Sequence, residues 1–475
     1  MKQFRPWSSG NQLTKYADRA DRTGHPGAGG RTDYGPDLDV TDERRHPERP
    51  WLSRSRLIPV YAAFTAYAAV AAALSGGRDQ VWAIWAACGY AVALFMLWRW
   101  PSRRVRMAAV LVSVVLAVLA PLLWLSVAYP LEDGMMVIDR SASLLLHHGT
   151  PYLSAAQVTS WLSYNPYLPV MTLFGLPYAA GLGGLAGNSG VWIAVGTVAV
   201  LAAAFWIAVP HRGCAACRRN AVLATAVAVA SPVVGLNLAV ITTDPPVLAL
   251  ILLGLALAGR TATTSPDEGT GTGAVGTGAV GAGIALGVAC DLKSTAWLAV
   301  PVLAAMFAAR DGARAAWRFV AAAVITAAVL IAALAPAALT SWRGADALVQ
   351  NSVLFPLGLT HDKTPAESLL PGHLLTALGP AGHVASVGLL LAAGLGIAVS
   401  LVIRPPREVS AATWRLAIGL TLMFLLGPQV RFGYFIYPLG LVGWLALTAT
   451  TAETHAARAG AQVSAGLAKD LLHDR

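Results

Sequence analysis

The feature that most constrains the fold is a series of apolar stretches, each about 17–25 residues long, that begins at Ile58 and continues almost to the C-terminus. A stretch of this length crosses about 30 Å of hydrocarbon as an α-helix, and a helix satisfies its backbone hydrogen bonds internally. Only 12% of the residues are charged, whereas soluble domains carry about 25%. The pattern predicts an all-α, polytopic helical membrane protein with about 10–13 transmembrane or re-entrant helices.

Charged residues are concentrated between the apolar stretches, and their distribution predicts the topology. Arginines cluster in the connection at 99–106, which the positive-inside rule places in the cytoplasm. The polar segment 129–165 is then a loop on the outer face, and 340–382 is a second outer loop. The same rule accounts for the net charge of +10 without a nucleic-acid partner.

The polar ends of the chain are expected to lie outside the membrane domain. Residues 1–57 are rich in Gly, Pro and charged residues, and they are predicted to be a disordered cytoplasmic tail. The membrane domain then extends over 58–449, and residues 450–475 form a second cytoplasmic tail. The Ala-, Gly-, Arg- and Val-rich composition indicates a bacterial protein of the plasma membrane.

Three stretches depart from simple spans. Prolines and a glycine interrupt 167–182, which predicts a broken or re-entrant element. The sequence TSPDEGTGTGAVGTGAVGAG, which follows Arg260 closely, is expected to be a flexible linker. The apolar segments 284–290 and 295–308 are short for spans, and they are predicted to be half-length helices that meet on the outer side.

A metal site is not expected. Cys214 and Cys217 form a CxxC pair beside His211, but a structural zinc site needs four ligands and the sequence has no second cluster. These cysteines are interpreted as loop residues, and no metal or other cofactor is predicted.

Ionisable residues of the membrane domain collect on its predicted outer side, where such groups are costly and usually functional. They are Glu132, Asp133, Asp139, Asp244, Asp291, Lys293 and Arg431. This set suits the transfer of a sugar from a lipid phosphate. A carboxylate takes the proton of the attacking hydroxyl, and fixed cations hold the leaving phosphate.

Several sequence landmarks occur in the order of a known family. RSASLLLHHGTPYL and YNPYLPVMTLFGLP follow the first acids, and later come DPP at Asp244, KSTAW at Lys293 and RFGYFIYP at Arg431. From about residue 107 to 445 the chain resembles the polyprenol-phosphate-mannose-dependent α-mannosyltransferases of glycosyltransferase family 87, in the GT-C superfamily. The resemblance implies a GT-C-like fold and an enzyme that transfers a sugar, typically mannose, from polyprenyl phosphate to a lipid or glycan acceptor.

The resemblance also implies that an Asp of the first outer loop is the general base. Asp133 and Asp139 compete for this role, because the Tyr that often follows the family's Asp is missing here. Asp133 is favoured, since Asp139 lies inside a presumed helix next to Arg140 and can pair with it. Glu132 is the third candidate acid.

Other predicted site residues bind the donor and the acceptor. Lys293 and Arg431 are predicted to hold the donor phosphate. Further substrate contacts are expected from Asp244, Tyr152, Tyr164, Tyr437 and His148. These residues could instead have a purely structural role. An Asp can cap a helix, a Lys can extend its ammonium to the membrane surface, and Arg and Tyr can anchor spans at the interface. The alternative function is a lipid-linked glycan flippase or small-solute transporter, although the sequence shows no inverted repeat of its spans.

Overall fold

The structure is a computed structural model, and it describes residues 53–208, 215–260, 271–356, 358–362 and 368–449. Throughout these ranges the chain forms helices joined by turns and loops, and none of the described residues lies in a strand. The all-α prediction is confirmed. The predicted tails apart from 53–57, the first part of the predicted linker and the side chains of the CxxC pair lie outside the described residues.

Seven stretches of the described chain are long and apolar enough to cross a membrane. They are α1 (Arg54–Leu74), α2 (Gly77–Arg99), the stretch from α3 (Arg103–Val114) through a π-helical turn to α4 (Ala120–Ala128), α8 (Ser189–Ala208), α14 (Ala313–Leu334), α18 (Pro380–Ile403) and α19 (Val409–Leu426). The length and composition of these helices are those of a multi-pass membrane protein.

Shorter apolar elements complete the set. They are α11 (Pro245–Arg260), the Thr277–Cys290 part of α12 (Gly271–Cys290), the stretch Phe432–Thr448 that contains α20 (Ile436–Thr448), and the pair α9 (Ala215–Ala230) and α10 (Pro232–Ala239). The last two helices are bent by 67° at Ser231. Seven long stretches, three short helices and one bent pair amount to eleven elements among the described residues, which agrees with the predicted number.

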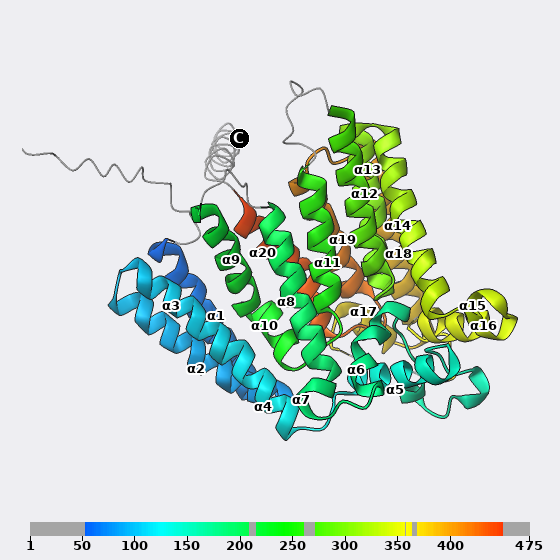
Figure 1. Ribbon diagram of the computed structural model, residues 1–475, viewed down its shortest axis with the longest axis horizontal. Coiled ribbons are helices and arrows are strands. Elements are labelled where there is room, and N and C mark those ends of the chain that lie inside the picture. Colours follow the sequence, from blue (N-terminus) through cyan, green and yellow to red (C-terminus); the bar gives the residue numbers. More distant parts are fainter. Residues whose placement is uncertain (1–52, 209–214, 261–270, 357, 363–367, 450–475) are drawn as a thin grey trace, which may run out of the picture. The chain divides into compact units, whose positions relative to one another are not determined.

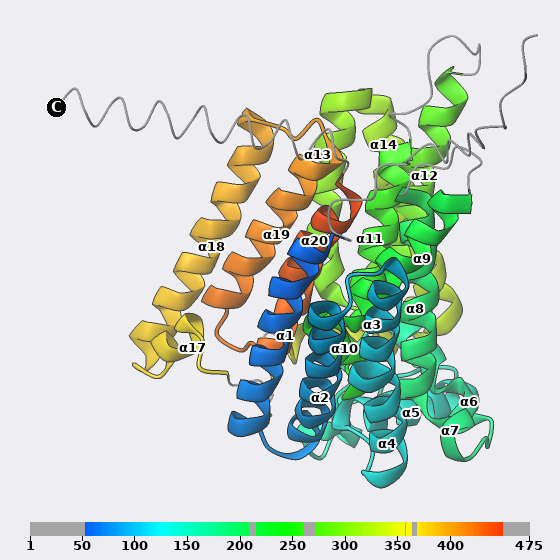
Figure 2. The ribbon, with the colours of Figure 1, turned by 90° about the vertical axis from the view of Figure 1, so that its left-hand side faces the viewer.

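The helices of the two predicted outer loops gather at one end of the helix bundle (Figure 1 and Figure 2). They are α5 (Asp133–His148), α15 (Ala337–Thr340), α16 (Trp342–Val349) and α17 (Pro371–Thr376). The two loops contact each other directly. The Asn165 N–H donates to Asn351 Oδ1 at 2.8 Å, and the Tyr164 ring stacks on Phe355 with a centroid distance of 4.4 Å.

The stretch 167–182 is broken, as predicted. It contains a 3-10 helix, Pro169–Gly175, that continues into the four-residue α6 (Leu176–Ala179); α7 (Gly184–Gly187) follows. Gly175 lies so close to α5 that a Cβ there would come within 2.8 Å of the Ile138 carbonyl oxygen. The irregular backbone is thus packed on protein, the setting in which it is tolerated at membrane depth.

The predicted flexible linker is wrong in its second half, because α12 includes both TGAVG units and continues to Cys290. Gly283 and Gly287 lie against α14, where a Cβ on Gly287 would come within 2.6 Å of the Ala323 carbonyl oxygen. Small residues four positions apart let two membrane helices approach closely. The second predicted half-helix is present as the 3-10 helix Ser294–Leu298 followed by α13 (Ala299–Asp311).

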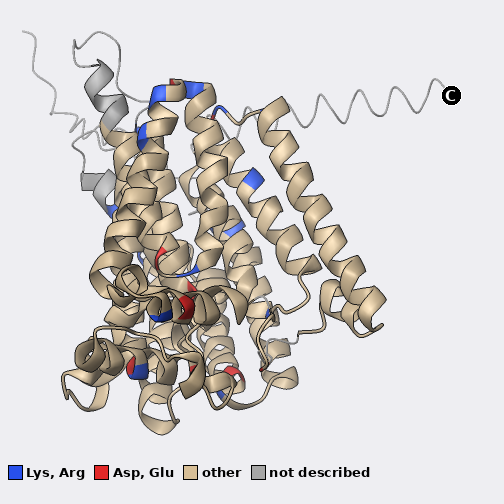
Figure 3. Cartoon of the chain, turned by 90° about the vertical axis from the view of Figure 1, so that its right-hand side faces the viewer, with Lys and Arg blue, Asp and Glu red and all other residues tan. Residues whose placement is uncertain are grey.

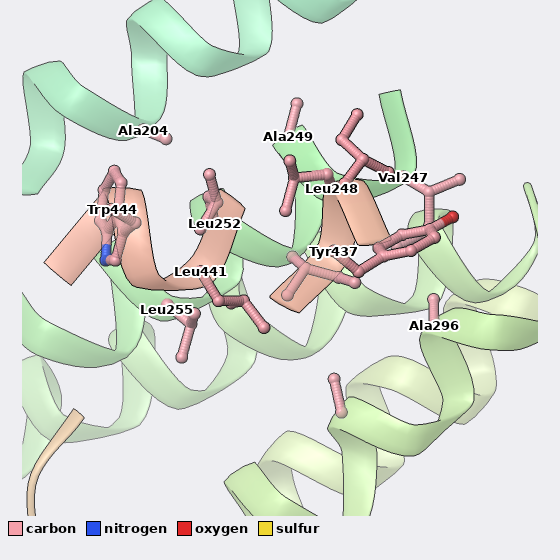
Figure 4. Close-up of a cluster of buried hydrophobic side chains, with 14 of the residues drawn as sticks. Ala204, Val247, Leu248, Ala249, Leu252, Leu255, Ala296, Tyr437, Leu441 and Trp444 are labelled. Atoms are coloured by element: carbon pink, nitrogen blue, oxygen red, sulfur yellow. The ribbon is translucent and has the colours of Figure 1, made fainter. Parts of the chain in front are cut away.

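The main hydrophobic core includes the contact of α8, α11 and α20. Figure 4 shows Leu441 and Trp444 of α20 beside Leu252 of α11, and all three side chains are buried. Phe205 of α8 packs on the Trp444 ring, with the ring centroids 4.7 Å apart. This core fixes the beginning of α11 against the beginning of α20, where the polar residues described next are found.

Candidate functional site

The centre of the candidate site is a buried ion pair between Lys293 and Asp244. Asp244 directly precedes α11, and Lys293 lies in the turn between α12 and the 3-10 helix Ser294–Leu298. Lys293 Nζ is 2.6 Å from Asp244 Oδ1, and the two side chains are only 13% and 7% exposed. The Tyr437 hydroxyl donates to the same Asp244 oxygen at 2.7 Å, and the Tyr434 ring centre lies 4.5 Å from Lys293 Nζ.

The positive charge of Lys293 is compensated within the pair. Burial by itself lowers the pKa of Lys293, but the Asp244 carboxylate and the neighbouring tyrosines outweigh this effect, so the net shift of the pKa is upward. The Asp244 carboxylate binds Lys293 and Tyr437. Pro245 and Pro246, the first two residues of α11, have no N–H to donate to it, which reduces the capping that this position can provide.

A second group of polar side chains lies beside the pair, at the beginning of α5. Glu132 caps α5 by accepting the Gly134 N–H at 2.7 Å. A Cβ on Gly134 would lie 2.8 Å from Glu132 Oε2, 2.8 Å from the Tyr167 hydroxyl and 3.7 Å from Thr243 Cγ2. Three side chains therefore converge on one glycine. Tyr167 also interacts electrostatically with Lys293, which joins the two groups into one site.

Two arginines flank Glu132. Arg431 is exposed and precedes the 3-10 helix Phe432–Phe435. Arg78 of α2 is half-buried and donates to the Pro130 carbonyl at 2.6 Å. Burial raises the pKa of Glu132, and the Gly134 N–H and both arginines partly offset this shift.

The site therefore combines a carboxylate that can accept a proton with cations that can hold an anion. Figure 3 shows that most acidic segments lie toward the end of the bundle that carries the loop helices. Of the predicted residues, Glu132, Asp244, Lys293, Arg431 and Tyr437 come together there.

Within the part of the chain that the structure describes, the other two predicted acids of α5 form no ion pair or side-chain hydrogen bond with this group. Asp133 is exposed at the first position of α5. Asp139 is 3% exposed and faces the beginning of α8, with the Ser189 hydroxyl beside it and no hydrogen-bond partner for either carboxyl oxygen among the described residues. Burial raises the pKa of Asp139 to about 6. His148 is exposed at the far end of α5.

Asp139 does not pair with Arg140, although their adjacency in the sequence allowed it. The Arg140 guanidinium instead donates to the carbonyls of Leu162 and Ser163, at 2.6 and 2.8 Å. Neighbouring side chains on a helix point in directions about 100° apart, so Arg140 reaches the following loop while Asp139 turns inward.

Tyr152 and Tyr164 support the loop framework. The buried Tyr152 hydroxyl donates to the Tyr167 carbonyl at 3.0 Å, and the buried Tyr164 stacks on Phe355. Neither contact involves the Lys293–Asp244 pair directly. Tyr152 nevertheless holds the backbone of Tyr167, a residue of the site.

Sequence reasoning missed the roles of Thr243, Arg78 and Asn351. Thr243 carried a usable signal, since it precedes the boundary acid Asp244. Arg78 lies at the beginning of α2, beside the short connection between two spans, where arginine has many structural roles. Asn351 gave no signal, because its bond to Asn165 joins residues that are 186 positions apart.

Comparison with protein-family models gave no match, and comparison with curated proteins gave none. Among solved structures, that of ArnT from Cupriavidus metallidurans in the apo state is similar to this chain with 17% identity and a TM-score of 0.43. The match covers 72% of this chain and 59% of ArnT, so the chain spans less than two thirds of the length of that protein.

Proposed function

We propose that the protein is a membrane glycosyltransferase that moves a sugar from a polyprenyl-phosphate donor to a lipid or glycan acceptor. The supporting observation is the convergence of Glu132, Tyr167 and Lys293 with Arg431 at the end of the helix bundle that carries the loop helices. A basic carboxylate beside fixed cations is what glycosyl transfer from a phosphate requires. The sequence resemblance favours mannose as the sugar and the outer face of a bacterial plasma membrane as the location.

In the proposed reaction, the acceptor oxygen attacks the anomeric carbon while its proton passes to a carboxylate. The bond between the anomeric carbon and the phosphate oxygen breaks, and its electron pair leaves with polyprenyl phosphate. One displacement inverts the anomeric configuration. Glu132 is better placed than Asp133 to be the base, because it faces Tyr167 and because burial raises its pKa toward the working pH.

The cations have different roles in this proposal. The charge of Lys293 is balanced by Asp244, so the ammonium offers directed N–H groups more than net charge. Arg431 is exposed and supplies the net positive charge for the leaving phosphate.

Glycosyl transfer is tested by incubating the purified protein with polyprenyl-phosphate mannose and candidate acceptors and measuring release of polyprenyl phosphate. Glu132→Gln keeps an oxygen that can accept the Gly134 N–H, so α5 stays capped, but it removes the base. We expect turnover to fall about 10²–10⁴-fold, and to fall less in Asp133→Asn.

Asp346→Asn is a control outside the site, in α16, and should keep the wild-type rate. Near-normal turnover in Glu132→Gln would reject Glu132 as the base. Movement of the lipid-linked sugar across vesicles without release of polyprenyl phosphate would instead identify a flippase.

A further inference from the structure

Asp291 is a buried carboxyl that the proposed reaction does not use. It lies in the turn after α12, two residues before Lys293, and it is 1% exposed. Neither carboxyl oxygen has a well-formed hydrogen bond, and no described Lys or Arg pairs with it. A buried carboxylate without a partner is far more costly than the neutral acid.

The backbone at Asp291 and Leu292 is hydrogen-bonded to the segment that follows Tyr167. The Asp291 carbonyl accepts the Val170 N–H at 3.1 Å, and the Leu292 carbonyl accepts the Leu168 N–H at 3.2 Å. Tyr152 donates to the Tyr167 carbonyl from the other side. The segment that carries Tyr167 is thus tied to the turn that carries Lys293.

The groups that face the Asp291 carboxyl do not compensate a negative charge. They are Tyr152 from the first loop, Cys290 on its own helix and the Val170 N–H from the broken element. Lys293 lies nearby but is bound to Asp244. Burial raises the pKa of Asp291 to about 8, and the Val170 N–H only partly offsets the shift.

We propose that Asp291 is a positioning residue whose protonated form keeps this turn closed, with Tyr167 and Lys293 aligned, and whose ionisation opens the turn and inactivates the site. Its effect on turnover rests on the proposed glycosyl transfer. Its effect on the turn itself is independent of that function.

Asp291→Asn tests the inference because the amide resembles the neutral acid and does not ionise. Wild-type transfer should fall about tenfold between pH 7 and pH 9, as expected for a single group with a pKa of about 8. In Asp291→Asn the rate should change less than about twofold over the same range. Asp346→Asn, the matched control, should follow the wild-type profile.

Thermal unfolding in detergent gives a readout that needs no activity. The folded-state pKa of Asp291 lies above its ordinary value of 3.8, so the folded protein binds a proton that the unfolded chain has lost. Stability should therefore fall as the pH rises from 6 to 8 and then level off. Asp291→Asn should lose this fall, and Asp346→Asn should keep it.

The outcomes separate the two proposals. Absence of transfer at every pH, with the predicted difference in unfolding, would reject the glycosyltransferase and keep the role of Asp291. Identical pH profiles and unfolding curves for wild type and Asp291→Asn would overturn the role of Asp291 alone. If Asp291→Asn does not fold, hydrogen exchange of the wild-type Leu168 and Val170 amides, corrected for intrinsic rates, should accelerate between pH 7 and pH 9; unchanged protection would overturn the proposal.

Discussion

Lys293 is already bound to Asp244, and in the proposed reaction this limits what a donor phosphate can gain from it. The two opposite charges are 2.6 Å apart, and Tyr437 donates a further hydrogen bond to the same carboxyl oxygen. A phosphate must therefore share the ammonium with Asp244. The pair serves both folding and the proposed binding, and these two contributions need separate measurements.

At this scale we predict that single and paired substitutions at Lys293 and Asp244 behave differently. Lys293→Met leaves the buried Asp244 carboxylate without its cation, and we expect a loss of about 3–5 kcal/mol in the free energy of unfolding. Adding Asp244→Asn removes that charge and should restore most of the stability. Sugar transfer should stay lost in the double variant, because the ammonium is absent.

The measurements are denaturation in detergent and release of polyprenyl phosphate, with Tyr437→Phe as the matched control for one lost hydrogen bond, worth about 1 kcal/mol. Recovery of transfer in the double variant would show that Lys293 has only a structural role.

The presence of Lys293 and Asp244 in the site was predictable, because ionisable groups are rare in an apolar chain. Their pairing was not, since the two residues are 49 positions apart and α11 and α12 lie between them in the sequence.

At the scale of helices, glycine content alone was a poor guide to structure. The TGAVG repeat predicted a linker because glycine disfavours helices in water. The repeat is nevertheless part of α12, and two glycines that follow it, Gly283 and Gly287, lie one helical turn apart on the face that packs on α14. The GxxxG spacing was present in the sequence and is the signal that the linker interpretation overlooked.

We therefore predict that Gly283→Ala destabilises the protein, because its Cβ would overlap the Phe319 carbonyl oxygen and the Ala322 side chain. Overpacking of this kind costs about 1–3 kcal/mol. Gly388→Ala in α18 is the matched control, since a Cβ there would meet nothing within 4 Å. Thermal unfolding should show a lower midpoint for Gly283→Ala only; equal midpoints would mean that α14 shifts to accept the methyl group.

At the scale of the whole described chain, apolar length and proline positions predicted the helices and the broken element at 167–182, because both follow from local physics. The contact between the two loops was beyond such reasoning. It depends on Asn165 with Asn351 and on Tyr164 with Phe355, pairs that only the packed helices bring together. The same holds for the candidate site. Most of its residues were predicted from the sequence, but the contacts between them were not.

The last prediction concerns which end of the bundle faces outward. Arg310, Arg314 and Arg318 surround the beginning of α14, and Trp342, 85% exposed, follows its other end. A helix of 22 residues spans about 33 Å, so these positions lie on opposite sides of a bilayer. The positive-inside rule then predicts that Trp342 and the candidate site lie outside.

In a background in which the native cysteines are replaced, Trp342→Cys should react with a membrane-impermeant maleimide on intact cells. Arg314→Cys should react only after permeabilisation. The opposite result would place the site in the cytoplasm, where nucleotide sugars are available, and would remove the topological reason for a lipid-linked donor. Labelling therefore tests the donor class without measuring transfer.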